Sequence, residues 1–233
     1  MTAFPPQPPA DLDDPRAIAD NDWAAFRTLD HMNTHWRRPG WTNGRRSYHW
    51  LLTFEEADEL RDHVRRCQDM LSFDSLDPVR PETVHVTLGR VAFTDEVRRR
   101  DALAAADLAA PLLERVLPFT LQVGPPAGSQ GAVRFSVSPW RPVLAVHELL
   151  ATATRTVLGD RCVMATAELR PHISIAYANA NLPTRSLVPA LTAARALIGP
   201  RIRIDAVSLV ELMRVDRSYR YERLRRVPLG GSP

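Results

Sequence analysis

Two short stretches of the sequence carry the same spacing of histidine and hydroxyl side chains. One reads VHVTL around His85 and Thr87, and the other reads PHISI around His172 and Ser174. Both alternate polar with apolar or β-branched residues, which predicts short β-strands. Because residues two apart in a strand lie on the same face, each stretch directs one imidazole and one hydroxyl to the same side. The apolar residues between them then face a core.

Two imidazoles and two hydroxyls have the chemistry that phosphoryl transfer needs. A neutral histidine accepts a proton from the attacking oxygen, and a protonated histidine donates one to the leaving oxygen. Hydroxyls donate hydrogen bonds to the non-bridging oxygens, where negative charge develops. Histidine suits both roles because its ordinary pKa of about 6.5 is close to neutral pH. A single such pattern is more often an ordinary strand histidine, but the doubling favours a shared site, and this chemistry requires no metal and no cofactor.

The two motifs resemble those of the 2H phosphoesterase superfamily, in particular the branch known as 2′-5′ RNA ligase or cyclic nucleotide phosphodiesterase. The resemblance lies in HVTL from His85, in RPHISI over residues 170–175, and in the segments 207–212 and 221–224, which are similar to that family's closing strand pair. It implies an α+β fold of two similar, duplicated lobes, with antiparallel sheets lining a central cleft and helices outside. Each lobe supplies one motif in that family, so His85 and His172 are expected to flank one phosphate as the catalytic pair.

The resemblance also implies an enzyme for ribose phosphodiesters, whose partner is RNA or a nucleotide with a cyclic or 2′-5′ phosphodiester. The expected reaction opens a 2′,3′-cyclic phosphate or, in reverse, joins RNA ends without ATP, with Thr87 and Ser174 binding the phosphate. Two alternatives remain open: a 2H-type enzyme for a small nucleotide or specialised metabolite, and a non-catalytic module that binds RNA or nucleotides. A metal-dependent hydrolase rests only on His31 and His35, which share one face of a predicted helix but lack a third ligand.

Further substrate contacts are expected from Arg90, Arg170, Tyr177, Trp36 and Trp41. Arg90 falls on the opposite face of its strand from the histidine, unless the preceding glycine bends the chain. Members of the resembled family often carry a basic residue near position 177, so the tyrosine there puts the phosphate clamp at that end in doubt. The two tryptophans enclose a pair of arginines, a mixture that suits base stacking, although packing against the body is the preferred interpretation.

Composition narrows the class of protein. The chain has 233 residues, of which 45% are hydrophobic and 24% charged, as in a globular protein with a sizeable core. Lysine is absent and all 30 basic residues are arginine, which excludes a ligase that works through a lysyl-nucleotide intermediate. The formal net charge of +3 is only a weak indication of nucleic-acid binding.

Neither a membrane segment nor a secretory signal is recognisable. No apolar run reaches the roughly 20 residues that a membrane span needs, and the N-terminus lacks a basic start followed by an apolar core. We therefore expect a cytoplasmic protein without membrane contact, present as a monomer. Cys67 and Cys162 are expected to be reduced residues of the core.

The first part of the chain is expected to lie outside the main body. Residues 1–19 are rich in proline and aspartate, which predicts a flexible leader. Residues 20–44 form a helical extension, with a helix over about 20–38 because Trp23, Phe26 and further apolar residues recur every three or four positions.

The body is expected over residues 45–230, in halves of about 45–117 and 118–230 that repeat the order strand, helix, histidine strand. Strands are predicted at about 47–54, 84–88, 119–123, 133–137, 171–175, 202–212 and 220–224, and helices at about 55–71, 95–117, 142–158 and 183–199.

Overall fold

Helices and strands alternate along the chain in the computed structural model, which describes residues 3–164 and 169–230. The helices are α1 (Pro15–Arg27), α2 (Asp58–Asp69), α3 (Arg99–Leu113), α4 (Arg141–Leu158) and α5 (Thr184–Ala194). The strands are β1 (His31–Met32), β2 (Arg46–Thr53), β3 (Leu76–Pro78), β4 (His85–Phe93), β5 (Phe119–Gly128), β6 (Ala132–Ser138), β7 (His172–Ala178), β8 (Leu182–Pro183), β9 (Arg201–Ile204), β10 (Ala206–Val215) and β11 (Ser218–Pro228). The expected α+β class is confirmed, and within the described ranges no helix has the length and hydropathy to cross a membrane.

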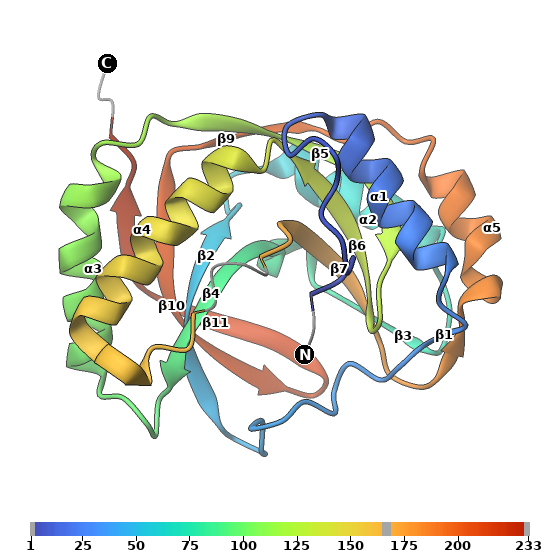
Figure 1. Cartoon of the computed structure of the whole chain (residues 1–233). Coiled ribbons are helices and arrows are strands. Elements are labelled where there is room, and N and C mark those ends of the chain that lie inside the picture. Colours follow the sequence, from blue (N-terminus) through green and yellow to red (C-terminus); the bar gives the residue numbers. More distant parts are fainter. Residues whose placement is uncertain (1–2, 165–168, 231–233) are drawn as a thin grey trace.

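The main sheet is antiparallel and curls around the middle of the molecule (Figure 1). Its strand order is β11-β10-β2-β4-β7-β6-β5-β9, with β3 added beside β7, while β1 and β8 pair separately. We call the strands β11-β10-β2-β4 the first lobe and the strands β7-β6-β5-β9 the second lobe. The helices lie outside the sheet: α3 and α4 pack together on the first lobe, and α1 and α5 on the second.

The two lobes do not coincide with the two halves of the sequence. β10, near the end of the chain, pairs with β2 of the first half, with Leu209 opposite Trp50, and β11 follows it at the edge. The first lobe is therefore completed by the last strands of the chain. Pairing between segments so far apart leaves no local signal, which is why a division at residue 117 does not describe the lobes.

The helices are also exchanged between the halves. α4 follows the second-lobe strand β6 but packs on the first lobe, where the Trp50 indole donates to the Thr154 hydroxyl at 3.1 Å. α2 follows the first-lobe strand β2 but packs under the second lobe, where the His63 ring lies 4.8 Å from the Phe135 ring. Each lobe is thus covered by a helix from the other half.

The N-terminal helix begins and ends earlier than the sequence predicts. α1 spans Pro15–Arg27, so it starts within the predicted leader and the predicted extent to residue 38 is wrong. Its start is fixed because the Asp14 side chain accepts a hydrogen bond from the Arg16 amide and a proline occupies the first turn.

Residues 3–14, expected as a flexible leader, run along the body and are held there by hydrogen bonds. The Trp140 amide donates to the Leu12 carbonyl at 2.7 Å, and the Asn21 side chain donates to the Gln7 carbonyl at 3.1 Å. In Figure 1 the segment is the dark-blue trace that leads to α1.

The chain between α1 and β2 is not helical, because its backbone hydrogen bonds go to other elements. β1 pairs with β8, the Asn33 amide donates to the Gln130 carbonyl at 2.7 Å, and the His35 amide donates to Ala178 at the same distance. Leu29, Met32 and Trp36 of this segment have helical spacing in the sequence, yet they pack from a chain that is not helical.

α1 is anchored in the core by Phe26, which is completely buried. Its ring lies against Gly128 of β5, where an added Cβ would collide with the ring. The absence of a side chain at position 128 therefore allows the helix to approach the sheet closely.

We predict that Phe26→Ala destabilises the protein by about 3–5 kcal/mol, because a fully buried ring is replaced by a cavity. Urea unfolding followed by circular dichroism measures this. Arg27→Ala, on the exposed face of the same helix, is the control and should change the free energy of unfolding by less than about 0.5 kcal/mol. Equal effects of the two substitutions would mean that α1 is a dispensable arm.

Candidate active site

The two histidine motifs line one cavity of about 370 Å³ between the lobes. The lobes meet where Val86 of β4 pairs with Ile173 of β7. Continuing this antiparallel register by one residue on each side puts His85 across from Ser174, and Thr87 across from His172. Each imidazole therefore lies beside the hydroxyl of the other motif, and all four side chains line the cavity.

A backbone carbonyl fixes the orientation and tautomer of each imidazole. His85 Nδ1 lies 2.8 Å from the Thr83 carbonyl, and His172 Nδ1 lies 2.6 Å from the Arg170 carbonyl. A carbonyl only accepts, so Nδ1 carries the hydrogen in both rings and donates it. Nε2 is then the nitrogen left for chemistry in the cavity: an acceptor in the neutral ring and a donor in the charged one.

Burial keeps both imidazoles neutral, but their surroundings differ. Burial lowers the pKa of His172 to about 3, and the positive charge of Arg134 is the second cause. Burial also lowers the pKa of His85, where the hydrogen bond to the Thr83 carbonyl opposes the shift. A neighbouring positive charge therefore opposes protonation of His172, whereas the causes that lower the pKa of His85 include no such charge.

Arg134 is the residue of this site that sequence reasoning missed. It pairs in register with Ser174, lines the cavity, and is only 4% exposed. Its Nη1 atom lies 3.3 Å from His172 Nδ1, and Nη2 donates to Asp22 of α1 at 3.0 Å. A single charged residue inside the predicted strand 133–137 was the available signal, because a buried arginine in a strand needs a partner.

Aromatic side chains also line the cavity. Trp41 and Tyr219 line it and meet edge to face, with ring centroids 6.1 Å apart, and the Arg214 guanidinium lies 4.4 Å above the Trp41 ring. His49 also lines the cavity. Burial lowers the pKa of His49 to about 3.

Of the further contacts expected from sequence, Arg170, Tyr177 and Trp41 line the cavity. Trp36 does not: its indole donates to Asp77 at 2.7 Å and its ring packs edge to face on Tyr177.

Arg90 also lies off the cavity lining, and its guanidinium stacks 4.4 Å over the Phe93 ring. β4 is irregular between Thr87 and Gly89, so the odd spacing from His85 does not decide the face of Arg90. The residue pairs with His49 in the sheet.

The spacing of His31 and His35 does not bring their rings to one face of a helix, because this part of the chain is extended. His31 is exposed, whereas the buried His35 ring is hydrogen-bonded to Tyr219 at 3.0 Å and to Arg38 at 2.8 Å. Both nitrogens of His35 are therefore engaged, and the described residues contain no cluster suited to a metal ion.

A family model described as the 2′-5′ RNA ligase superfamily matches residues 55–216. The chain belongs to this superfamily. The match contains both histidine motifs and confirms the 2H resemblance, while α1 and the segment before it lie outside the matched region.

Solved structures agree with the superfamily fold. TT0787 of Thermus thermophilus has a TM-score of 0.61 and 19% identity, over 81% of this chain and 100% of that one. Escherichia coli LigT complexed with 3′-AMP has a TM-score of 0.59 and 16% identity, over 80% and 99%. A crystal structure described as a phosphoesterase has a TM-score of 0.58 and 17% identity, over 80% and 99%. At these identities the likeness concerns the fold, and no curated protein sequence matches the chain.

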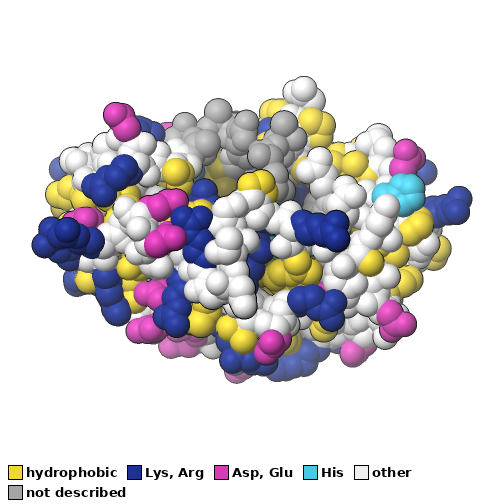
Figure 2. All heavy atoms as spheres, turned by 90° about the horizontal axis from the view of Figure 1, so that it is seen from below, with side chains coloured by type: hydrophobic (Ala, Val, Ile, Leu, Met, Phe, Trp, Pro, Cys, Tyr) yellow, Lys and Arg dark blue, Asp and Glu magenta, His cyan; other side chains and the backbone are white. Residues whose placement is uncertain are grey.

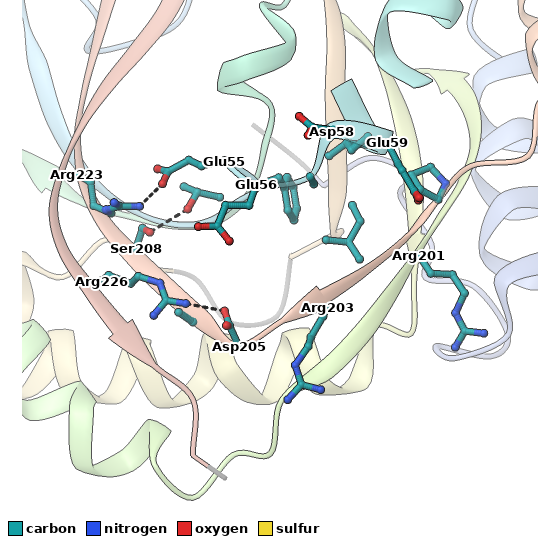
Figure 3. Close-up of a pocket in the computed structure, with 17 residues that line it drawn as sticks. Glu55, Glu56, Asp58, Glu59, Arg201, Arg203, Asp205, Ser208, Arg223 and Arg226 are labelled. Atoms are coloured by element: carbon teal, nitrogen blue, oxygen red, sulfur yellow. Dashed lines mark hydrogen bonds and ion pairs between the residues drawn. The ribbon is translucent and has the colours of Figure 1, made fainter. Parts of the chain in front are cut away.

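A larger hollow of about 660 Å³ lies elsewhere on the protein (Figure 3). It is less suitable than the histidine cavity as a phosphate-binding site. Its walls carry carboxylates and guanidiniums that pair with each other: Arg223 contacts Glu55, and Arg226 contacts Asp205 at 2.8 Å. None of the described residues that line it is a histidine. Figure 2 likewise shows arginine and acidic side chains interspersed over the face seen from below, so positive charge is not gathered there. The superfamily motifs and the local positive charge both lie at the smaller cavity.

The buried neutral histidines predict a loss of stability in weak acid. Burial lowers the pKa of His35 to about 2, and those of His49 and His172 to about 3, whereas an unfolded histidine titrates near 6.5. Because the unfolded chain binds these protons first, stability is complete above about pH 6.5 and falls below it. The loss reaches up to about 2 kcal/mol per group at pH 5.

Urea unfolding at pH 7 and pH 5 measures this loss. His35→Gln should reduce the difference between the two pH values, and His31→Gln, at an exposed position, is the matched control. Equal stability of the wild-type protein at pH 7 and pH 5 would contradict the prediction.

Proposed function

We propose that the protein is a metal-independent phosphodiesterase that opens 2′,3′-cyclic phosphates on ribose, with His85 and His172 as its acid–base pair. The observation that supports this most is the pair of part-buried imidazoles in one cavity, each with its Nδ1 hydrogen donated to a carbonyl and each beside a hydroxyl. Such a site offers two Nε2 atoms and two hydroxyl groups to a single phosphate.

In the proposed reaction, Nε2 of His172 takes a proton from water as the water oxygen attacks phosphorus. The bond from phosphorus to one ribose oxygen breaks, and that oxygen takes the proton from Nε2 of protonated His85. Thr87 and Ser174 donate to the non-bridging oxygens while charge develops on them. The product is a ribose phosphomonoester, and proton exchange with solvent restores both rings.

The guanidinium of Arg134 is the reason for assigning the base role to His172. It lies 3.3 Å from that ring and disfavours its protonation, so His172 is ready to accept a proton. Among the described residues, no arginine contributes to the lowered pKa of His85. A bound phosphate anion favours the charged form of His85, which then acts as the acid.

Recognition of a ribonucleotide follows from the side chains that line the cavity. Trp41 and Tyr219 offer aromatic surfaces on which a base stacks, while the histidines and Arg134 offer hydrogen-bond donors to a phosphate. LigT, whose fold is similar, has been crystallised with 3′-AMP and with ATP, which supports a nucleotide as the ligand of this fold.

The same site supports the reverse reaction, 2′-5′ joining of RNA ends without ATP, when a ribose hydroxyl replaces water. A second candidate is a 2H-type enzyme for a small nucleotide or specialised metabolite, which is favoured because Ala3 and Phe4 of the N-terminal segment also line the cavity and reduce its room. Turnover of 2′,3′-cyclic mononucleotides but not of oligonucleotides with a cyclic end would favour this candidate.

We predict that the protein hydrolyses 2′,3′-cyclic mononucleotides in the presence of EDTA, and that His85→Ala and His172→Ala each lower kcat/KM by about 10²–10⁴-fold. Chromatography of the products measures the rate. His31→Ala, at an exposed position outside the cavity, should retain full activity. Turnover that needs an added metal would contradict the mechanism, and binding without turnover would favour a non-catalytic RNA- or nucleotide-binding module.

We predict that Trp41→Ala raises KM for a cyclic mononucleotide by about 5- to 100-fold with a smaller change in kcat, because stacking of one base contributes about 1–3 kcal/mol. Trp41→Phe should retain most of the affinity. Trp23→Ala, which removes an indole from α1 outside the cavity lining, is the control. An unchanged KM in Trp41→Ala would remove this aromatic side chain from the binding site.

A further inference from the structure

The charged contact between β6 and α1 lies directly beside the reacting groups. Arg134 and Asp22 are 4% and 2% exposed, so both charges are withdrawn from water. Arg134 stands next to Ser174 in the sheet register and reaches His172, whereas Asp22 comes from a helix outside the region matched by the superfamily. The pair thus connects a helix outside the matched region with the histidine site.

Only some of the N–H donors of Arg134 have an acceptor among the described residues. Nη2 donates to Asp22 at 3.0 Å and to the Phe4 carbonyl at 2.8 Å. Nη1 approaches His172 Nδ1, but that nitrogen already donates its hydrogen to the Arg170 carbonyl and cannot accept another. Nε is buried and has no acceptor in the described part of the chain. A guanidinium has five N–H donors, so donors next to the cavity remain to be satisfied by an anion.

The charges around Arg134 are also unbalanced. Burial raises the pKa of Asp22, and the charges of Arg134, Arg195 and Arg170 oppose the rise, so one carboxylate lies among three guanidiniums. Arg134 and Arg170 both line the cavity. The surplus positive charge therefore faces the space where a phosphate would lie.

The position at which family members often carry a basic residue is neutral here. Tyr177 occupies it, and its ring is stacked on His35 with centroids 3.9 Å apart. A cation for the phosphate must then come from elsewhere in the lining, which contains Arg38, Arg134 and Arg170. Of these three only Arg134, on β6, is buried.

We propose that Arg134 is the phosphate-binding guanidinium of this site, replacing a basic residue at position 177, and that Asp22 of α1 is the positioning residue that aims it. This inference rests on the proposed function for its substrate but concerns phosphate binding itself. The N–H groups of Nη1 and Nε, which Asp22 and Phe4 leave unused, supply the charge-assisted hydrogen bonds to phosphate oxygens.

The first experiment measures the affinity for inorganic phosphate by calorimetry, which requires no turnover. Arg134→Gln should weaken phosphate binding at least about tenfold, and Arg134→Lys should restore part of the affinity, since lysine keeps the charge but not the fork. Arg203→Gln, at an exposed position in the larger hollow of Figure 3, is the control for loss of one positive charge. Equal phosphate affinity of Arg134→Gln and wild type overturns the proposal, whether or not the protein hydrolyses cyclic phosphates.

A second variant separates binding from folding, because breaking a buried ion pair leaves an unpaired charge. Asp22→Asn combined with Arg134→Gln replaces both charges with neutral amides and should recover the melting temperature that Arg134→Gln loses. The inference requires that this folded double variant still bind phosphate at least about tenfold more weakly than wild type. Wild-type affinity in the double variant overturns the proposal.

Kinetics test the positioning role of Asp22. Asp22→Asn should lower kcat for a 2′,3′-cyclic nucleotide about tenfold while KM changes less than threefold, because the guanidinium is present but poorly aimed. Arg134→Gln should also move the acidic limb of the kcat/KM profile to higher pH, since His172 loses the neighbouring charge that opposes its protonation. An unmoved acidic limb, or an Asp22→Asn variant with wild-type kcat, contradicts these roles.

Discussion

The pairing of Val86 with Ile173 is the contact on which the candidate site depends. It is the point where β4 and β7 join the two lobes, and its register determines which side chains face each other across the seam. Both apolar residues point into the core and are fully buried. The period of two in a strand then directs both imidazoles and both hydroxyls to the opposite face. A shift of the strand register by one residue would bury the polar groups and expose the apolar ones. The same register therefore determines both the packing of the core and the arrangement of the site.

The sequence was most informative where a short period and a doubled motif coincided. The alternation around His85 and His172 predicted two strands and the face that each histidine occupies. The helices of the body were found because their apolar residues follow helical spacing. Residues 20–38 show the limit of this reasoning: the same spacing of aromatic residues arises where an extended chain packs from several points, and only the hydrogen-bond partners distinguish the two cases.

Two features had no local signal. The return of β10 to β2 is a long-range pairing, and the strands involved look the same in sequence whichever neighbour they choose. Arg134 was hidden in an apolar strand, and its partner Asp22 comes from a helix 112 positions away. Knowing the superfamily did not help here, because α1 and the segment before it lie outside the region that the family model matches. Such a contact is visible only once the fold has placed both residues.

The exchange of helices between the lobes has a consequence for how the molecule comes apart. α4 from the second half covers the first lobe, α2 from the first half underlies the second, and the last strands of the chain complete the first lobe. Neither half can bury its own apolar face when separated from the other. The two halves of the chain therefore depend on each other for their packing and are not two independent modules. The body should melt in a single cooperative transition. For the same reason, an ancestor made of one half would have needed a second copy of itself to be stable.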